Sequence, residues 1–415
     1  MSDAPRPARA RDLLAQRDYV RFWRSRWVGN FGSTIQSVAM GWQVYALSRR
    51  TADVAHSAFN VSLIGLCTFA PLFLLALPAG ATADRRNRRN IMLACYAVEA
   101  AAVGVLLLAS LAGRASVALL LLDALVFGAS RAYRSPATNA LGPALVPREL
   151  LPRAIAWNSL AGQTASVAGP AAAGFLLAFS TAAAYGASFA FFVLAVLSLA
   201  TVRQPPMPPA PTASRLEQVK EGLSYVWTNK VVFGAISLDL AAVILGGATA
   251  LLPAFARDVL KVGAEGFGIL RAATSFGAAI VAVMLAAAPM RRQAGLRMFA
   301  GVAVYGAATI AFSLSKELWA SAVFLAILGG ADMLSVFVRQ NLIQLTTPDP
   351  MRGRVAALSS LFVGASNELG EFESGLVARF LGVIGSALFG GAGALFVTGA
   401  GAALFPSLRK ADRLE

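Results

Sequence analysis

The chain has 415 residues, of which 57% are hydrophobic and only 14% are charged, and its mean hydropathy is +0.64. A soluble domain of this size could not bury so much apolar surface, so the composition excludes an ordinary water-soluble fold. Apolar stretches of about 20 residues recur along the sequence and predict membrane-spanning helices, because open strand edges cannot face lipid. We therefore predict an all-α integral membrane protein that crosses the bilayer many times.

Twelve membrane-spanning helices are predicted from the apolar stretches and the polar loops between them. In chain order they cover residues 25–47, 57–82, 91–112, 115–141, 154–179, 182–202, 231–256, 267–289, 295–315, 318–346, 355–381 and 383–406. Most of the 36 Lys and Arg fall in the two tails and in the loops on their side, which predicts a cytoplasmic location for both termini. The formal charge of +15 thus follows the membrane topology, and its placement argues against nucleic-acid binding.

The middle of the chain is marked by the Pro-rich segment RQPPMPPAPTAS, which cannot continue a helix and is followed by a short amphipathic stretch. We therefore expect three parts, which are an N-terminal tail and six-helix bundle at 1–202, a cytoplasmic linker with an amphipathic helix at 203–230, and a second six-helix bundle and tail at 231–415. The halves are related, because VPRELLPRAIAWNSL at 146–160 matches TPDPMRGRVAALSSL at 347–361. Such a repeat predicts two pseudo-symmetric bundles with a substrate site between them.

The loop after the second predicted helix reads GATADRRNRRN and combines a Gly, an Asp-Arg pair and a basic pair. This combination resembles the most diagnostic motif of the major facilitator superfamily of transporters, and the matching residues are Gly80, Asp84, Arg85, Arg88 and Arg89. Gly80 lets two membrane helices approach closely, and the charged residues are predicted to form a latch between the two halves in one transport state. We expect the positive N-terminal end of the helix at 355–381 to be the partner of Asp84. The alternative is that the arginines only set the topology.

The predicted helix at 154–179 contains the segment AGQTASVAGPAAAG. This segment is similar to the Gly-Pro signature associated with exporters and antiporters of the superfamily, although Ala173 replaces one Gly of the usual closing pair. The matching residues are Gly162, Gly169, Pro170 and Gly174. Three further stretches, SVAMGWQVYALS, RSPATNALGPALVPRELLPRAIAWNSL and TPDPMRGRV, resemble the bacterial efflux branch that includes enterobactin exporters. The resemblance implies a secondary transporter of the bacterial inner membrane that exports a small molecule.

Ionisable side chains inside the predicted helices are costly unless they are paired or hydrated, so each one is a candidate for function. Polar and charged residues gather on the helices at 25–47, 115–141, 231–256 and 318–346, which correspond to the cavity-lining helices of the superfamily that the sequence resembles. The predicted substrate-cavity residues are Gln36, Trp42, Gln43, Tyr45, Asp332, Arg339 and Gln340. Asp123 and Asp239 are candidates for carrying protons.

Alternatives remain open for several of these charged residues. Asp332 and Arg339 lie seven residues apart on one helix face, where they can form a structural ion pair instead of a substrate contact. Arg131 and Arg134 lie toward the cytoplasmic end of their helix and can extend to the membrane surface. Glu99 lies on a helix that should be peripheral, and no role is assigned to it.

The segment GASNELGEFESG at 364–375 concentrates acid in the predicted helix at 355–381. Glu368 lies roughly 20 Å into that helix, and Glu371 shares its face, whereas Glu373 points away. Repulsion and desolvation favour the neutral forms of two such carboxyl groups, as a proton-carrying site requires. The single histidine, His56, falls in an outer loop, which leaves carboxyl groups as the candidates for proton coupling. The alternatives are that these glutamates pair with Arg271 or Arg379, or that they face water.

The sequence as a whole predicts a proton-driven exporter of a small amphiphilic molecule, such as a siderophore or a drug-like compound, that works by alternating access. The alternative is an importer or facilitator of a small polar metabolite with the same fold. A membrane-embedded enzyme or a non-transporting sensor is disfavoured, because no phosphate loop, metal cluster or nucleophile motif is present. We expect no cofactor and no metal, and we expect the protein to act as a monomer in the lipid bilayer.

Overall fold

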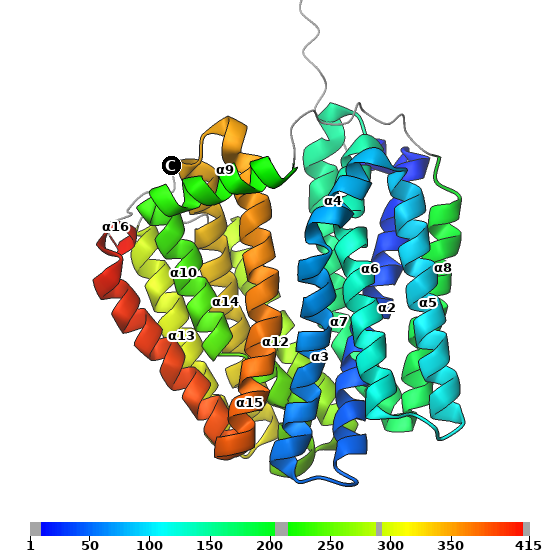
Figure 1. Ribbon diagram of the computed structural model, residues 1–415, viewed down its shortest axis with the longest axis vertical. Coiled ribbons are helices and arrows are strands. Elements are labelled where there is room, and N and C mark those ends of the chain that lie inside the picture. The colour runs from blue at the N-terminus through cyan, green and yellow to red at the C-terminus, as the bar shows by residue number, and fades with distance from the viewer. Residues whose placement is uncertain (1–9, 204–214, 288–292, 410–415) are drawn as a thin grey trace, which may run out of the picture.

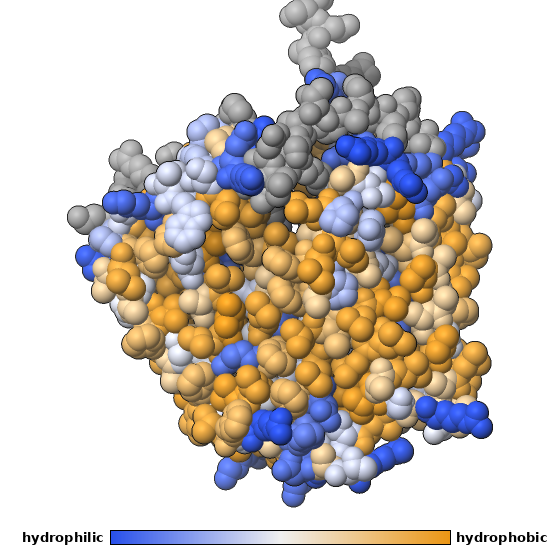
Figure 2. Space-filling model, in the orientation of Figure 1, coloured by the Kyte–Doolittle hydropathy of each residue, from blue (hydrophilic) through white to orange (hydrophobic). Residues whose placement is uncertain are grey.

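Two bundles of α-helices stand side by side in the computed structural model of the protein, which describes residues 10–203, 215–287 and 293–409 (Figure 1). The described residues contain no β-strand, and helices cover most of the described part of each predicted membrane segment. Within the described ranges, eight helical spans are long and apolar enough to cross a bilayer. Hydrophobic residues cover the middle of the visible face, and hydrophilic residues gather at its two ends (Figure 2). The predicted all-α fold with two bundles is confirmed.

The N-terminal half forms one bundle, and its helices run alternately up and down. Its elements are α1 (Ala10–Leu14), α2 (Arg17–Ser48), α3 (Val54–Leu74), α4 (Ala76–Arg85), α5 (Arg88–Leu111), α6 (Val117–Ala144), η1 (Arg148–Leu150), α7 (Leu151–Phe179) and α8 (Thr181–Ala200). Short polar caps begin several of them. The Ser116 hydroxyl, for example, accepts from the backbone N–H of Leu119 at the start of α6.

The second half forms the other bundle and begins with the linker helix α9. Its elements are α9 (Arg215–Thr228), α10 (Lys230–Leu245), η2 (Ala248–Leu251), α11 (Leu252–Ala254), η3 (Phe255–Val259), α12 (Gly263–Ala287), α13 (Ala294–Leu314), α14 (Leu318–Thr346), α15 (Asp349–Leu404) and α16 (Pro406–Arg409). The predicted amphipathic helix corresponds to α9. Most of the predicted Pro-rich linker, residues 204–214, lies outside the described residues.

The last two predicted helices are the two arms of α15, which turns back on itself at Gly382 (Figure 1). Gly382 has φ 74° and ψ 171°, a conformation that is open only to glycine. The turn therefore occurs at the residue that separates the predicted segments 355–381 and 383–406.

Two predicted helices are interrupted in the structure. The segment at 57–82 forms α3 and α4, because Pro78 has no N–H to donate to the carbonyl of Leu74. The segment at 231–256 ends as α10 and continues through η2, α11 and the π-helix η3. At that break the Tyr305 hydroxyl donates to the carbonyl oxygen of Gly246 at 2.6 Å, which satisfies a carbonyl at the end of α10.

The two ends of the molecule differ in how closely the bundles meet. We call the end with α9, α16 and the first turns of α2 the linker end, and the opposite end, with η3 and the loop at 49–53, the far end (Figure 1). Contacts between the bundles run mainly through α3 against α15 and α7 against α12. They include the rings of Phe59 and Phe372, 6.2 Å apart, and a hydrogen bond from Tyr45 to Asp258 in η3. These contacts hold the bundles together toward the far end.

Candidate transport site

A cavity of about 440 Å³ lies between the two bundles, with walls from α2, α6 and α7 on one side and α12 on the other. Its lining residues are Asn30, Ser33, Thr34, Ser37, Val38, Phe127, Arg131, Arg134, Gly162, Ala165, Ser166, Pro170, Arg271 and Ser275. The charged residues in this lining are all arginines. An environment of hydroxyl groups and guanidinium groups favours a ligand that is rich in oxygen or carries negative charge.

One wall of the cavity is a polar stripe on α2 formed by Asn30, Ser33, Thr34 and Ser37. The spacing of three and four residues places these side chains on one face of the helix. The stripe was not predicted from the sequence, which had pointed to Gln36 and Gln43 on the same helix. The signal was present, because small polar side chains recur at helical spacing within an otherwise apolar segment.

Glu368 links the two bundles beside this cavity. Its carboxylate accepts a hydrogen bond from the guanidinium of Arg131 at 2.8 Å, and the two residues lie on α15 and α6, in different halves of the chain. The Glu368 side chain is only 14% exposed, whereas Arg131 is 43% exposed. A Cβ at Gly65 of α3 would lie 2.8 Å from the backbone oxygen of Glu368, so a glycine is needed for α15 to approach this closely.

Glu371 lies one turn further along α15 and is held within the second bundle. Its carboxylate lies 3.8 Å from a guanidinium nitrogen of Arg271 and accepts a hydrogen bond from the Thr249 hydroxyl at 2.9 Å. Arg271 also donates to the backbone oxygen of Thr249 at 3.4 Å. Glu373 contacts its own neighbour Ser374 instead, which agrees with its predicted orientation. The acidic segment thus divides into one inter-bundle contact, one contact within a bundle and one separate residue.

The pairing partners of these glutamates were foreseen only in part. Arg271, the partner of Glu371, was one of the two arginines that sequence analysis offered. Arg131, the partner of Glu368, was expected to extend to the membrane surface or to take a functional role. Arg379, the second arginine offered, lies over the ring of Phe59 at 5.4 Å.

Buried polar pairs extend from the cavity into the N-terminal bundle. Arg134 donates to the Ser33 hydroxyl at 3.3 Å and lies 3.4 Å from the carboxylate of Glu99, which also accepts from Ser130 at 2.9 Å. Arg134 is thus held inside the bundle and does not extend to the membrane surface. Glu99, which sequence analysis left without a role, is the buried counter-charge of this arginine.

The remaining candidate carboxyl groups each have a different environment. Asp123 is buried and accepts a hydrogen bond from the Gln36 amide at 2.6 Å. Asp239 forms a buried ion pair with Arg339, on α10 and α14 respectively. The alternative of an ion pair between Asp332 and Arg339 is therefore not what the structure shows, because Arg339 pairs with Asp239. Their spacing of seven residues corresponds to about 10 Å along α14, and the long arginine side chain extends sideways to the neighbouring helix instead.

None of the seven predicted substrate-cavity residues is among the lining residues of the 440 Å³ cavity. Gln36 and Gln43 are buried inside the N-terminal bundle, where Gln43 accepts from the Tyr185 hydroxyl at 2.8 Å. Trp42 stacks on Phe267 of α12 at 5.6 Å. On α14, Gln340 is exposed and Asp332 lies in a small hollow beside Asp239. Four of the candidates therefore lie on α2, away from the face that lines this cavity, and the other three lie on α14, which does not line it.

Tyr45 takes part in a contact between the bundles at the far end. Its hydroxyl donates to the carboxylate of Asp258 in η3 at 2.5 Å, and Arg49 donates to the other oxygen of the same carboxylate at 3.3 Å. The Tyr45 side chain is fully buried, and those of Arg49 and Asp258 are partly buried. We call this group the far-end lock. The lock was not predicted from the sequence, because Asp258 follows the predicted helix at 231–256 and has no feature there that distinguishes it from a loop residue.

The Gly-Pro segment of α7 faces both the cavity and the other bundle. Gly162 and Pro170 line the cavity, and Gly169 packs on Thr34. Gly174 meets Gly268 of α12, where an added Cβ would lie 2.5 Å from the Gly268 Cα atom. Two glycines thus permit the bundles to touch backbone to backbone at this crossing.

Gly174→Ala is therefore expected to lower the melting temperature of the purified protein, because overpacking at a tight contact costs about 1–3 kcal/mol. Gly162→Ala is the matched control on the same helix, since its Cβ would meet nothing within 4 Å. It should leave the melting temperature unchanged or raise it slightly, as alanine is the better helix former. Equal melting temperatures for the two variants would contradict the close-contact interpretation.

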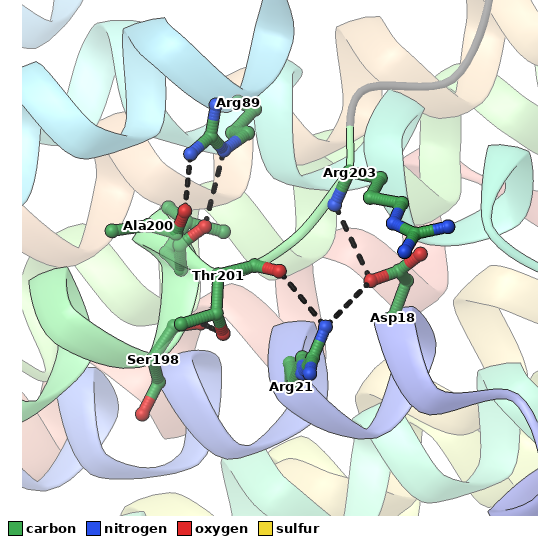
Figure 3. A network of polar contacts seen from close by, with 8 residues as sticks. Asp18, Arg21, Arg89, Ser198, Ala200, Thr201 and Arg203 are labelled. Carbon is green, nitrogen blue, oxygen red and sulfur yellow. Dashed lines mark hydrogen bonds and ion pairs between the residues drawn. The ribbon is translucent and has the colours of Figure 1, made fainter.

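The predicted latch residues lie at the linker end, around the junction of α4 and α5. Arg88 donates to the backbone oxygens of Ala83 at 3.2 Å and Ala140 at 3.4 Å. Arg89 donates to the backbone oxygens of Leu199, at 3.2 Å, and Ala200, at the end of α8 (Figure 3). These two arginines thus join helix ends within the N-terminal bundle.

The other members of the predicted latch lie close by. Gly80 and Asp84 belong to α4, and Arg85 ends it with an exposed side chain. The linker helix α9 contacts α4, so the two halves of the chain do approach each other here. At the start of α15, Arg354 forms an ion pair with Glu221 of α9. A latch role for Asp84 stays a prediction.

Comparison with known proteins identifies the family. The sequence profile described as transmembrane secretion effector matches residues 12–415. The enterobactin exporter EntS of Shigella boydii is 29% identical over 363 residues, which cover 87% of this chain and 83% of that protein. EntS of Salmonella choleraesuis is 27% identical over 371 residues, which cover 89% of this chain and 86% of that protein.

Solved structures of transporters share the fold. The POT family transporter PepTSo superposes with a TM-score of 0.75 at 12% identity, covering 95% of this chain and 99% of that chain. A bacterial homologue of the lysosomal transporter Spinster, in an inward-facing and unoccupied conformation, gives a TM-score of 0.71 at 15% identity, covering 95% of this chain and 97% of that chain. The chain is therefore a multi-pass membrane transporter of the major facilitator type, not an enzyme, and it belongs to the transmembrane secretion effector family.

Proposed function

We propose that the protein is a proton-driven exporter of a small amphiphilic molecule with anionic or oxygen-rich groups, such as a catecholate siderophore. The observation that carries this proposal is the ion pair between Glu368 and Arg131, which joins the two bundles beside the cavity. The similarity to enterobactin exporters supports the direction of transport and the substrate class. The excess of Lys and Arg in the tails supports a cytoplasmic linker end in the bacterial inner membrane.

The arginines of the cavity support an anionic substrate. Arg131, Arg134 and Arg271 all line it, but they do not have equal freedom. Arg134 is 12% exposed and held by Glu99, and Arg271 is shared between Glu371 and Thr249. Arg131 is the most exposed of the three, so it is the best placed to bind a substrate that enters from the linker end.

A transport cycle follows from competition for Arg131. An anionic group of the substrate that binds Arg131 displaces Glu368 and breaks the link between the bundles, which favours opening toward the far end. Glu368, now unpaired in a poorly hydrated site, takes up a proton from the outer side after the bundles rearrange. The neutral carboxyl group lets the bundles return, and loss of the proton to the cytoplasm restores the ion pair. Substrate and proton therefore occupy the site in turn, as antiport requires.

Flux through the purified protein in lipid vesicles with an imposed pH gradient tests this function. A catecholate siderophore should cross the membrane in the direction opposite to the protons, and its transport should dissipate the pH gradient. Amphiphilic cations should move more slowly or not at all. If neither class moves and neither dissipates the gradient, the exporter function is wrong. Movement of a siderophore with no effect on the gradient would indicate a facilitator instead.

A further inference from the structure

A second, larger cavity lies outside the transport path, on the outer surface of the N-terminal bundle. This groove has a volume of about 690 Å³ and runs between α5 and α6 below the end of α4. Its lining residues are Thr82, Arg86, Asn87, Asn90, Ile91, Ala94, Cys95, Val98, Val126, Ala129, Ser130 and Tyr133. None of these residues lines the cavity between the bundles. The groove faces the surroundings of the protein, since Asn90, Ala94 and Val98 are all exposed.

The groove is amphipathic along its length. From Asn87 to Val98 it follows α5 for about 16 Å, at a rise of 1.5 Å per residue. The end nearest the linker end is polar, with Arg86 and Asn90, and the remainder is lined mainly by apolar and small side chains. In Figure 2 hydrophilic surface likewise gathers over the ends of α4 and α5, and hydrophobic surface covers both bundles below it. A polar head at the membrane surface above an apolar slot is the shape of a lipid.

Arg86 gives the groove its charge preference. Its side chain is exposed and makes no hydrogen bond or ion pair with any residue that the structure describes. The neighbouring Arg88 and Arg89 are used by backbone oxygens of their own bundle. The cation at the rim is thus available to a ligand, and Arg is well suited to bind a phosphate group through two parallel hydrogen bonds.

We propose that this groove binds an anionic phospholipid from the leaflet at the linker end. The headgroup phosphate lies against Arg86 and Asn90, and one acyl chain fills the slot between Ala94 and Val98 of α5 and Val126 and Ala129 of α6. Each basic residue at a membrane surface attracts anionic lipids with about 1 kcal/mol. We therefore expect Arg86 to contribute about this much to binding the headgroup.

The floor of the groove gives this lipid a path to the transport site. Ser130 lines the groove and donates to the Glu99 carboxylate at 2.9 Å, and Glu99 is the counter-charge of Arg134. Arg134 in turn donates to Ser33 in the wall of the central cavity. A lipid that orders the groove therefore also restrains the residues that hold Arg134 in place.

Native mass spectrometry of the purified full-length protein tests the proposal, with phosphatidylglycerol and phosphatidylcholine of the same acyl chains as probes. The wild-type protein should retain more phosphatidylglycerol than phosphatidylcholine. Arg86→Gln should weaken retention of phosphatidylglycerol about fivefold and leave phosphatidylcholine unchanged. Arg85→Gln is the matched control, because this exposed arginine precedes Arg86 but does not line the groove, and it should behave as the wild type. Ala94→Phe fills the slot and should lower retention of both lipids.

Three results would overturn the proposal. Equal retention by the Arg86→Gln and Arg85→Gln variants would mean that the surface attracts anions without a site. Unchanged retention by Ala94→Phe would mean that no acyl chain enters the slot. Displacement of phosphatidylglycerol by inorganic phosphate alone would indicate a site for a free anion. Because lipid retention is read without any transport, its failure is distinguishable from failure of the exporter function.

Discussion

Glu368→Gln is expected to abolish proton-driven export while sparing substrate exchange in the absence of a gradient. Glutamine keeps the shape of the side chain and can still accept a hydrogen bond from Arg131, but it cannot take up or release a proton. The lost charge weakens the contact between α6 and α15 by roughly 1–2 kcal/mol, which alters the balance between transport states without removing the cavity. The measurement compares efflux from vesicles with and without a pH gradient.

Glu373→Gln is the control for this experiment. Glu373 lies on the same helix and loses the same charge, but its contact is with the neighbouring Ser374 and not with the other bundle. This variant should export as the wild type does. Gradient-driven export by the Glu368→Gln variant at the wild-type rate would reject the coupling role of Glu368.

A double variant separates proton transfer from simple charge neutralisation. If Glu368 serves only to neutralise Arg131, the single change leaves an uncompensated cation, and adding Arg131→Gln should restore function. If Glu368 carries the proton, the Glu368→Gln/Arg131→Gln variant should remain uncoupled, and it should also bind an anionic substrate poorly. Recovery of driven export in the double variant would therefore assign a structural role to the pair.

The membrane segments were predictable from the sequence because the bilayer imposes a strong local rule. About 20 consecutive apolar residues are needed to cross it, and a polar loop or a break in the helix separates one run from the next. The turn of α15 at Gly382 illustrates this point, since the predicted segments part at that residue. The breaks after α3 and α10 were missed, because they depend on Pro78 within one segment and on packing of Tyr305 against the other.

The sequence predicted which kinds of residue form the site, but not which of them contact one another. Helical spacing separated Glu373 from Glu368 and Glu371 correctly, because that relation is local. The partner of Glu368 lies 237 residues away in the chain, and no periodicity shows which face of α6 meets α15. For the same reason the sequence offered Asp332, on the same helix, as an alternative partner of Arg339, although the actual partner Asp239 lies on α10. Pairing between helices is a property of packing, which a single sequence does not specify.

Asp258→Asn is expected to open the far end of the protein. In the far-end lock, the Asp258 carboxylate accepts from the Tyr45 hydroxyl at 2.5 Å and from Arg49 at 3.3 Å. One side chain of the second bundle thus binds two side chains of the N-terminal bundle. Asparagine keeps one acceptor but removes the charge that strengthens both bonds. We expect a loss of about 1–2 kcal/mol, which shifts the ratio of closed to open far ends roughly 5- to 30-fold.

Distance measurements between spin labels report this shift. Labels at Thr51 and Lys261, both exposed at the far end, should show a larger fraction of long distances in the Asp258→Asn variant. Cys67 and Cys95 are free thiols and must first be replaced. Tyr45→Phe removes only the hydroxyl donor and should give a smaller shift in the same direction.

The control for the lock is Asp53→Asn, which removes an acidic charge at the same end. Asp53 caps α3 by accepting from the backbone N–H of His56 at 2.7 Å, and asparagine is an equally good cap. Its distance distribution should match the wild type, whereas identical distributions for the Asp258→Asn and Asp53→Asn variants would show that the lock does not hold the far end closed. Because the proposed export requires the far end to open on each cycle, a weakened lock should also raise the rate of substrate exchange wherever opening limits it. In the proposed cycle the two inter-bundle contacts have different roles. The far-end lock keeps the far end closed, and the Glu368–Arg131 pair couples its opening to uptake of a proton.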